Sequence, residues 1–125
     1  MSNERFERGL ELLKKIDGEA GEAVLEALAD FPDMAEHMVA FAFGDIYARP
    51  GLSLRDRELV TLGALVALGH ARPQLKVHLN ASLNVGITRD ELAEVMLHAA
   101  LYTGFPAALN GLFAAKEVFA ERDGE

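Results

Sequence analysis

The stretch from Tyr47 to Gly86 constrains the fold most, because its periodicity predicts two consecutive helices. Both helices carry ionisable side chains among apolar ones. Residues 54–68 are apolar on every side after their first turn, which is typical of a central, buried helix. Gly69 ends this helix, and Pro73 starts the next one. Ionisable groups that enter a buried helix pair are common at sites that handle protons. We therefore expect the functional residues to lie on this helix pair.

The rest of the chain also has helical periodicity, and no segment alternates as a strand would. We predict an all-α fold of six or seven helices, forming a single domain over residues 1–125. Residues 32–48 carry two apolar faces, so we expect one of them to contact another subunit. The helices expected outside the central pair cover residues 6–16, 19–30, 32–48, 89–103 and a last segment opened by Pro106.

Two short patterns mark helix starts. Thr88 and Glu91 form a capping box before the helix over residues 89–103. Ser53 and Asp56 resemble such a box before the central helix, with Asp in place of the usual Glu or Gln. Both patterns predict where a helix begins.

Composition excludes several classes of protein. The chain has no cysteine, so disulfides, thiolate nucleophiles and cysteine-based zinc sites are excluded, and no histidine pair has the HxxxH spacing of a metal site. A net charge of −8 argues against a nucleic-acid partner. The charged start shows no signal peptide, and no apolar run is long enough to span a membrane. A cytoplasmic protein without metal is the expectation.

The charges are unevenly distributed. From Ile16 to Asp45 there are eight acidic residues and no Lys or Arg, whereas basic residues dominate between residues 46 and 88. Either these cations hold an anionic ligand, or they pair with the acidic segment within or between subunits, which is the more common arrangement. The basic residues concerned are Arg49, Arg55, Arg57, Arg72 and Lys76.

Glu58 and His78 are the candidate proton-handling residues. Glu58 lies about one turn inside the central helix, where a buried carboxyl can act as a general acid or base. The alternative is an ion pair with Arg55 or Arg57 on an exposed first turn. His78 shares a helical stripe with residues 71 and 74 and lies near the basic cluster. A lone histidine of this kind is often a hydrogen-bonded core residue instead.

Three further residues follow in the second half of the chain. His98 and Tyr102 are four apart on one helix, so they can face a cavity together or simply pack locally. Phe105, in the Gly-Phe-Pro sequence, can form a pocket wall, although Gly and Pro there also serve as a helix stop and a helix start.

Three blocks in order identify a resemblance: RPGLSLRDRELVTLGALVALG, then PQLKVHLNASLNVGITRDEL, then ALYTGFPAALNGLFAAKEVF. Together they resemble the carboxymuconolactone decarboxylase family of the AhpD-like superfamily over roughly residues 40 to 120. The resemblance implies an all-α subunit in a ring-shaped homo-oligomer, a trimer or hexamer. It also implies cofactor-free decarboxylation of 4-carboxymuconolactone in aromatic compound catabolism.

The superfamily also includes alkylhydroperoxidases with a Cys-x-x-Cys pair, a following histidine and an upstream glutamate. The resemblance places the histidine at His78 and the glutamate at Glu58, while the cysteine positions fall near Ala71 and Gln74. Without thiolates, thiol peroxidase activity has no chemical basis. The resemblance thus keeps the proton-handling pair and loses the redox pair.

The decarboxylase interpretation gives each candidate a role. Glu58 and His78 become the catalytic pair, and the five basic residues become candidates to bind the carboxylate that the substrate retains. Phe43, Tyr102 and Phe105 would line an apolar pocket that favours loss of CO2. Two alternatives remain open: a family member acting on another small acid, and a non-catalytic helical oligomer.

Overall fold

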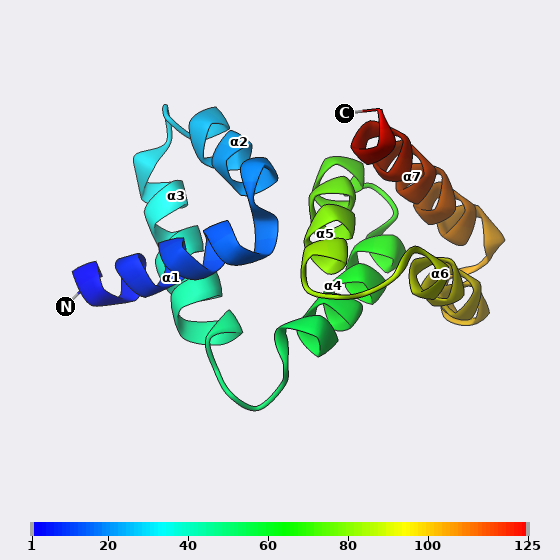
Figure 1. The fold of residues 1–125 in the computed structure, drawn as a ribbon, viewed down its shortest axis with the longest axis horizontal. Helices are drawn as coiled ribbons and strands as arrows, with labels where there is room; N and C mark the ends of the chain where they lie inside the picture. The colour runs from blue at the N-terminus through cyan, green and yellow to red at the C-terminus, as the bar shows by residue number, and fades with distance from the viewer. Residues whose placement is uncertain (1, 125) are drawn as a thin grey trace. The chain divides into compact units, whose positions relative to one another are not determined.

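The computed structural model describes residues 2–124, with side chains from Glu4 onward, and all the regular structure within them is helical. The predicted all-α class with seven α-helices is confirmed in this range, and a π-helical segment, η1, continues the third of them. None of the described helices combines the length and apolar composition that a membrane crossing needs. In chain order the elements are α1 (Ser2–Asp17), α2 (Glu19–Ala27), α3 (Pro32–His37), η1 (Met38–Tyr47), α4 (Leu54–Leu68), α5 (Arg72–Asn84), α6 (Arg89–Thr103) and α7 (Phe105–Asp123) (Figure 1).

The chain divides into two compact units, Met1–Leu54 and Arg55–Glu125. In the first unit, α1 packs against η1 at two glycines. A Cβ atom on Gly9 would lie 2.0 Å from the carbonyl oxygen of Val39, and one on Gly44 would lie 2.3 Å from that of Arg5. The two backbones therefore approach more closely than any side chain would allow.

Two predictions for the first unit need correction. Residues 32–48 are helical as expected, but from Met38 the winding is π, with i→i+5 hydrogen bonds. The second helix ends at Ala27 instead of residue 30. Phe31 precedes a proline and has an extended φ of −131°, so the chain leaves the helix early and turns over residues 28–30.

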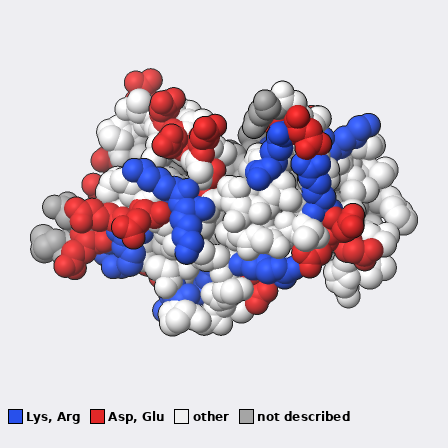
Figure 2. All heavy atoms as spheres, in the orientation of Figure 1, with Lys and Arg blue, Asp and Glu red and all other residues white. Residues whose placement is uncertain are grey.

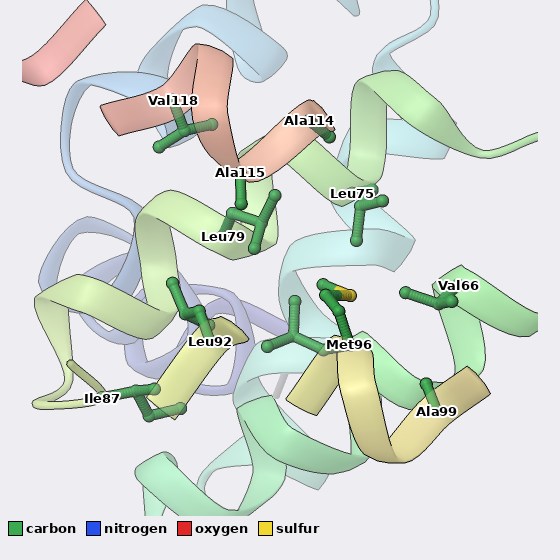
Figure 3. Close-up of a cluster of buried hydrophobic side chains, with 11 residues drawn as sticks. Val66, Leu75, Leu79, Ile87, Leu92, Met96, Ala99, Ala114, Ala115 and Val118 are labelled. Carbon is green, nitrogen blue, oxygen red and sulfur yellow. The ribbon is translucent and has the colours of Figure 1, made fainter. Parts of the chain in front are cut away.

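The core of the second unit is built from all four of its helices (Figure 3). The predicted bounds of α4 and α6 are confirmed exactly, and the capping box between Thr88 and Glu91 is present. Gly111 lets α7 come close to α6, because a Cβ there would lie 2.5 Å from the sulfur of Met96. The core consists of Leu62, Val66, Leu75, Leu79, Ile87, Leu92, Met96, Ala99, Ala114, Ala115 and Val118.

Helix α4 is not enclosed on every side, contrary to the prediction. Its buried residues are Glu58, Leu62 and Val66, which recur every fourth position and so form one face. Val60 and Leu68 are exposed. Within the second unit, the other helices therefore cover one face of α4.

Candidate functional site

Glu58 lies in the second turn of α4 on the face that packs into the core. Its spacing from Leu62 and Val66 directs the carboxyl inward, and its side chain is fully buried. The predicted alternative, an ion pair on an exposed first turn, requires an exposed carboxyl and does not fit this burial. A buried carboxyl needs a hydrogen-bonding partner to offset its lost hydration.

His78 on α5 is that partner. Its Nδ1 lies 2.9 Å from Oε1 of Glu58, and 17% of its side-chain surface remains exposed. One turn later, the hydroxyl of the buried Ser82 donates to the carbonyl oxygen of His78 at 2.6 Å. Ser82 carries no side-chain signal in the sequence, because its hydroxyl bonds a backbone carbonyl that any residue at position 78 would offer. Glu58 and His78 are thus brought together, as predicted.

The other carboxylate oxygen of Glu58, Oε2, is buried and has no hydrogen-bond partner in the described part of the chain. When the carboxyl is ionised, Nδ1–H of His78 donates to Oε1, and this bond fixes the tautomer and leaves Nε2 as a proton acceptor. A proton taken up at Nε2 gives an imidazolium that the Glu58 carboxylate stabilises. The pair can therefore take up, hold and return one proton.

Three of the five predicted anion-binding cations are paired with carboxylates. Arg55 bonds Glu91 on α6. On α7, Glu117 bonds Arg72, and Lys76 lies 2.8 Å from Glu121. Figure 2 shows basic and acidic side chains next to one another on the surface of the second unit. The expected pairing of cations with acids does occur, but these partners lie on α6 and α7 and not in the segment between residues 16 and 45.

These ion pairs shift the pKa values of Lys76, Glu91 and Glu117. A hydrogen bond from Lys76, together with the charge of Arg72, lowers the pKa of Glu117, and a hydrogen bond to Glu121 raises the pKa of Lys76. The backbone N–H of Thr88 and the guanidinium of Arg55 lower the pKa of Glu91. The shifted groups, Lys76, Glu91 and Glu117, are therefore charged at neutral pH.

The remaining two cations lie in different units. Arg57 is half-buried directly before Glu58 on α4, and its carbonyl oxygen accepts a hydrogen bond from Thr61. Arg49 lies in the first unit, at the edge of a groove that also includes Tyr47.

A largely apolar groove of about 620 Å³ runs between α4 and α6. His98 and Tyr102 both line it, with ring centroids 5.7 Å apart, so the two expectations for this pair, a shared cavity and local packing, both hold. Phe105, the first residue of α7, is 69% exposed and lines none of the described cavities. Phe43 is buried in the first unit, where it stacks on Tyr47.

Neither Glu58 nor His78 is among the residues that line this groove between α4 and α6. The carboxyl is sealed by packing, and the imidazole alone of the two reaches the surface. His78 is therefore the group of the pair that a substrate can meet.

Comparison with known proteins gives consistent matches. Residues 32–117 match the carboxymuconolactone decarboxylase family. A 4-carboxymuconolactone decarboxylase of Acinetobacter baylyi is 41% identical over 120 residues, which cover 94% of this chain and 89% of that protein.

Two further relatives are more distant. A nitrosuccinic acid decarboxylase of Metarhizium robertsii is 30% identical over 114 residues, covering 90% of this chain and 79% of the relative. An uncharacterised 15.0 kDa protein of Paracoccus denitrificans is 35% identical over 95 residues, covering 75% and 71% of the two chains. Two of the three relatives carry the names of decarboxylases, which supports the prediction of an enzyme of this class. The chain belongs to the carboxymuconolactone decarboxylase family.

Proposed function

We propose that this chain is a cofactor-free carboxy-lyase that removes CO2 from a small unsaturated carboxylated lactone, with 4-carboxymuconolactone as the first candidate. The observation that carries the proposal is the hydrogen bond between the buried Glu58 and the partly exposed His78. The similarity to a named 4-carboxymuconolactone decarboxylase supports the choice of substrate. Aromatic compound catabolism in the cytoplasm is the context in which such a substrate arises.

The reaction needs an electron sink and a proton. When the carboxylate leaves as CO2, the electron pair of the broken C–C bond moves through the C=C bond into the lactone carbonyl and forms a dienolate. His78, protonated at Nε2 and hydrogen-bonded through Nδ1 to Glu58, donates a hydrogen bond to the developing enolate oxygen or a proton to carbon. The proton is regained from water, and Glu58 stabilises the imidazolium in between.

The second carboxylate of such a substrate stays on the product and needs a cation. Arg55, Arg72 and Lys76 are held by α6 and α7 carboxylates, so an anion would have to compete with those partners. Arg57, half-buried on α4, is a further candidate for this role. Tyr102, in the groove between α4 and α6, is the candidate to contact the apolar part of the substrate, although neither Glu58 nor His78 lines that groove.

A ring-shaped homo-oligomer, a trimer or hexamer of single-domain subunits, completes the proposal. Large apolar side chains are exposed on two neighbouring helices of the second unit, which favours burial against other copies. On α7 they recur every fourth residue and form one face. The exposed residues are Leu97 and Leu101 on α6, with Phe105, Leu109 and Phe113 on α7.

The test is turnover of 4-carboxymuconolactone by the purified protein, followed as release of CO2, with the His78→Gln variant as control. We expect wild type to turn over and the variant to lose most of its rate while its thermal midpoint changes little. If the wild type is inactive on this lactone but active on another small acid, only the substrate assignment is wrong. The relative named for nitrosuccinic acid makes a panel of small acids the second test. Inactivity on the whole panel would favour a non-catalytic oligomer.

A further inference from the structure

A second groove, of about 680 Å³, lies wholly within the first unit. It is formed by one side of α1, by the last residue of η1 and by the turn that follows. None of the roles proposed above uses it, except that Arg49 stands at its edge. We call it the cationic groove, and define it by Arg8, Leu12, Lys15, Tyr47, Arg49 and Leu52.

The charge of this groove is opposite to that of its unit. Residues 1–54 contain eleven acidic and five basic residues. Three of the five basic residues line the groove, whereas Glu11 is the single acidic residue among those that line it. In an acidic unit, attraction between opposite charges favours basic residues that are distributed among the acidic ones. Three basic residues against one acidic residue on one concave surface favour anions, with the charge of Arg8 partly compensated by Asp45.

The cations of the groove are held in different ways. Arg8 is fixed, because its Nε donates to the carbonyl oxygen of Gly44 at 2.7 Å and its guanidinium also contacts Asp45. Asp45 is in turn bonded by Arg5, which lowers the pKa of its carboxyl. Lys15 has no ion-pair partner among the described residues. It is therefore available to an external carboxylate.

The remaining surface of the groove is apolar. Leu12, Leu52 and Pro50 supply aliphatic surface. Tyr47 is held in place by stacking on the buried Phe43, with ring centroids 4.9 Å apart and planes 14° apart. Tyr47 ends the π-helix, and π-helical segments occur frequently at functional sites. A fixed aromatic ring, an aliphatic wall and an available ammonium group together fit a ligand with an apolar body and one carboxylate.

We infer that the cationic groove is a binding site for a small organic acid, with the carboxylate on Lys15 and Arg49 and the apolar body against Leu12, Leu52 and Tyr47. This assignment does not depend on the decarboxylase proposal, because neither Glu58 nor His78 takes part in it. An acidic side chain of another copy of the chain carries the same carboxylate group. The experiment must therefore distinguish a free small acid from a neighbouring copy.

The chain allows an optical test, because it has no tryptophan and two tyrosines. In a Tyr102→Phe background, Tyr47 is the sole tyrosine and its fluorescence reports on the groove. We expect a saturable change in this fluorescence with hexanoate. Hexanol has the same apolar body without the charge, and sulfate has charge without the body, so both should give at least about tenfold weaker binding.

Lys15→Gln should weaken hexanoate binding about three- to tenfold. Lys14→Gln is the matched control, because Lys14 is exposed on the same helix and does not line the groove. Circular dichroism checks that both variants keep their helices, and Leu52→Asn tests the apolar wall independently. His78→Gln should bind hexanoate as tightly as the parent, which separates this site from the catalytic proposal.

Three results would overturn the inference: no saturable change with hexanoate, equal effects of the two lysine variants, or hexanol binding as well as hexanoate. A fourth result identifies the other carboxylate source. If hexanoate binds only after dilution has dissociated an assembly, a neighbouring copy fills the groove, and the small-acid assignment is wrong.

Discussion

Nδ1 of His78 lies 2.9 Å from Oε1 of Glu58, and the two side chains differ sharply in their access to solvent. The carboxyl is fully buried, whereas the imidazole keeps 17% of its side-chain surface exposed. This asymmetry places a group that can exchange protons at the surface and the group that orients it beneath.

If Glu58 and His78 act as one unit, their variants should be strongly non-additive. We expect His78→Ala and Glu58→Gln each to reduce kcat/KM by about 10²- to 10⁴-fold, and the double variant to lose little more. Turnover and thermal midpoints should be measured on the same samples. A purely structural pair would instead lower activity only in proportion to the folded fraction. A well-folded His78→Ala variant with full activity would end the proposal.

Gly9, at the crossing of α1 and η1, should not tolerate a side chain without a loss of stability. In Gly9→Ala the added methyl would meet the carbonyl of Val39, so the two helices must separate, and we expect a loss of about 2 kcal/mol or more in the free energy of unfolding. Gly63→Ala is the control, since a Cβ there meets nothing within 4 Å and α4 should gain about 0.5–1 kcal/mol. Urea unfolding measures both. Equal midpoints for Gly9→Ala and wild type would contradict this packing.

Acid should weaken the contact between α5 and α7. The pKa of Glu117 in the folded chain lies below its ordinary value of 4.5, chiefly because of the hydrogen bond from Lys76. The stabilisation is therefore present above pH 4.5 and is lost as the pH falls through the lower, folded-state value. We expect Glu117→Gln to have a lower thermal midpoint than wild type at pH 7 and a smaller difference near pH 3.

The control for this pH dependence is Glu94→Gln, an exposed carboxylate of α6 without a described ion pair. Its thermal midpoint should follow that of wild type at every pH. A constant difference between Glu117→Gln and wild type from pH 7 to 3 would show that ionisation of Glu117 does not matter for stability.

Assembly should depend on the exposed apolar face of α7. Replacing Leu109 or Phe113 with Glu buries a charge in any interface formed there, so we expect smaller assemblies by sedimentation at the same protein concentration. Asn110→Glu adds the same charge one residue away and should have less effect. A wild type that sediments as a stable monomer at micromolar concentration would refute the oligomer itself.

The fold was predictable where the sequence carries stop and start signals. Gly69 and Gly104 end α4 and α6, and the Thr88–Glu91 box starts α6, so these bounds were found exactly. The π winding of η1 was not predictable, because an apolar pattern over ten residues fits both windings. The contact between Gly9 and Gly44 depends on how two helices cross, which no local pattern encodes.

The site was predictable in part for a similar reason. Glu58 stands out as a charged residue in an apolar helix, and the family resemblance pointed to Glu58 and His78 together. The partners of Arg72 and Lys76 were missed, because Glu117 and Glu121 lie more than forty residues away in sequence and meet them only when α7 packs on α5. Whether a given cation is available therefore depends on tertiary structure.

The ion pairs between α5 and α7 have a consequence for how substrate preference could change over time. Two positive charges on the helix of His78 are neutralised by carboxylates on another helix. Loss of a single carboxylate on α7 would leave a net positive charge on α5 without altering any residue near the imidazole. Under the proposed function, preference for monoanions or dianions can thus drift through mutations on the outer helix, while the pair of Glu58 and His78 on α4 and α5 is inherited unchanged.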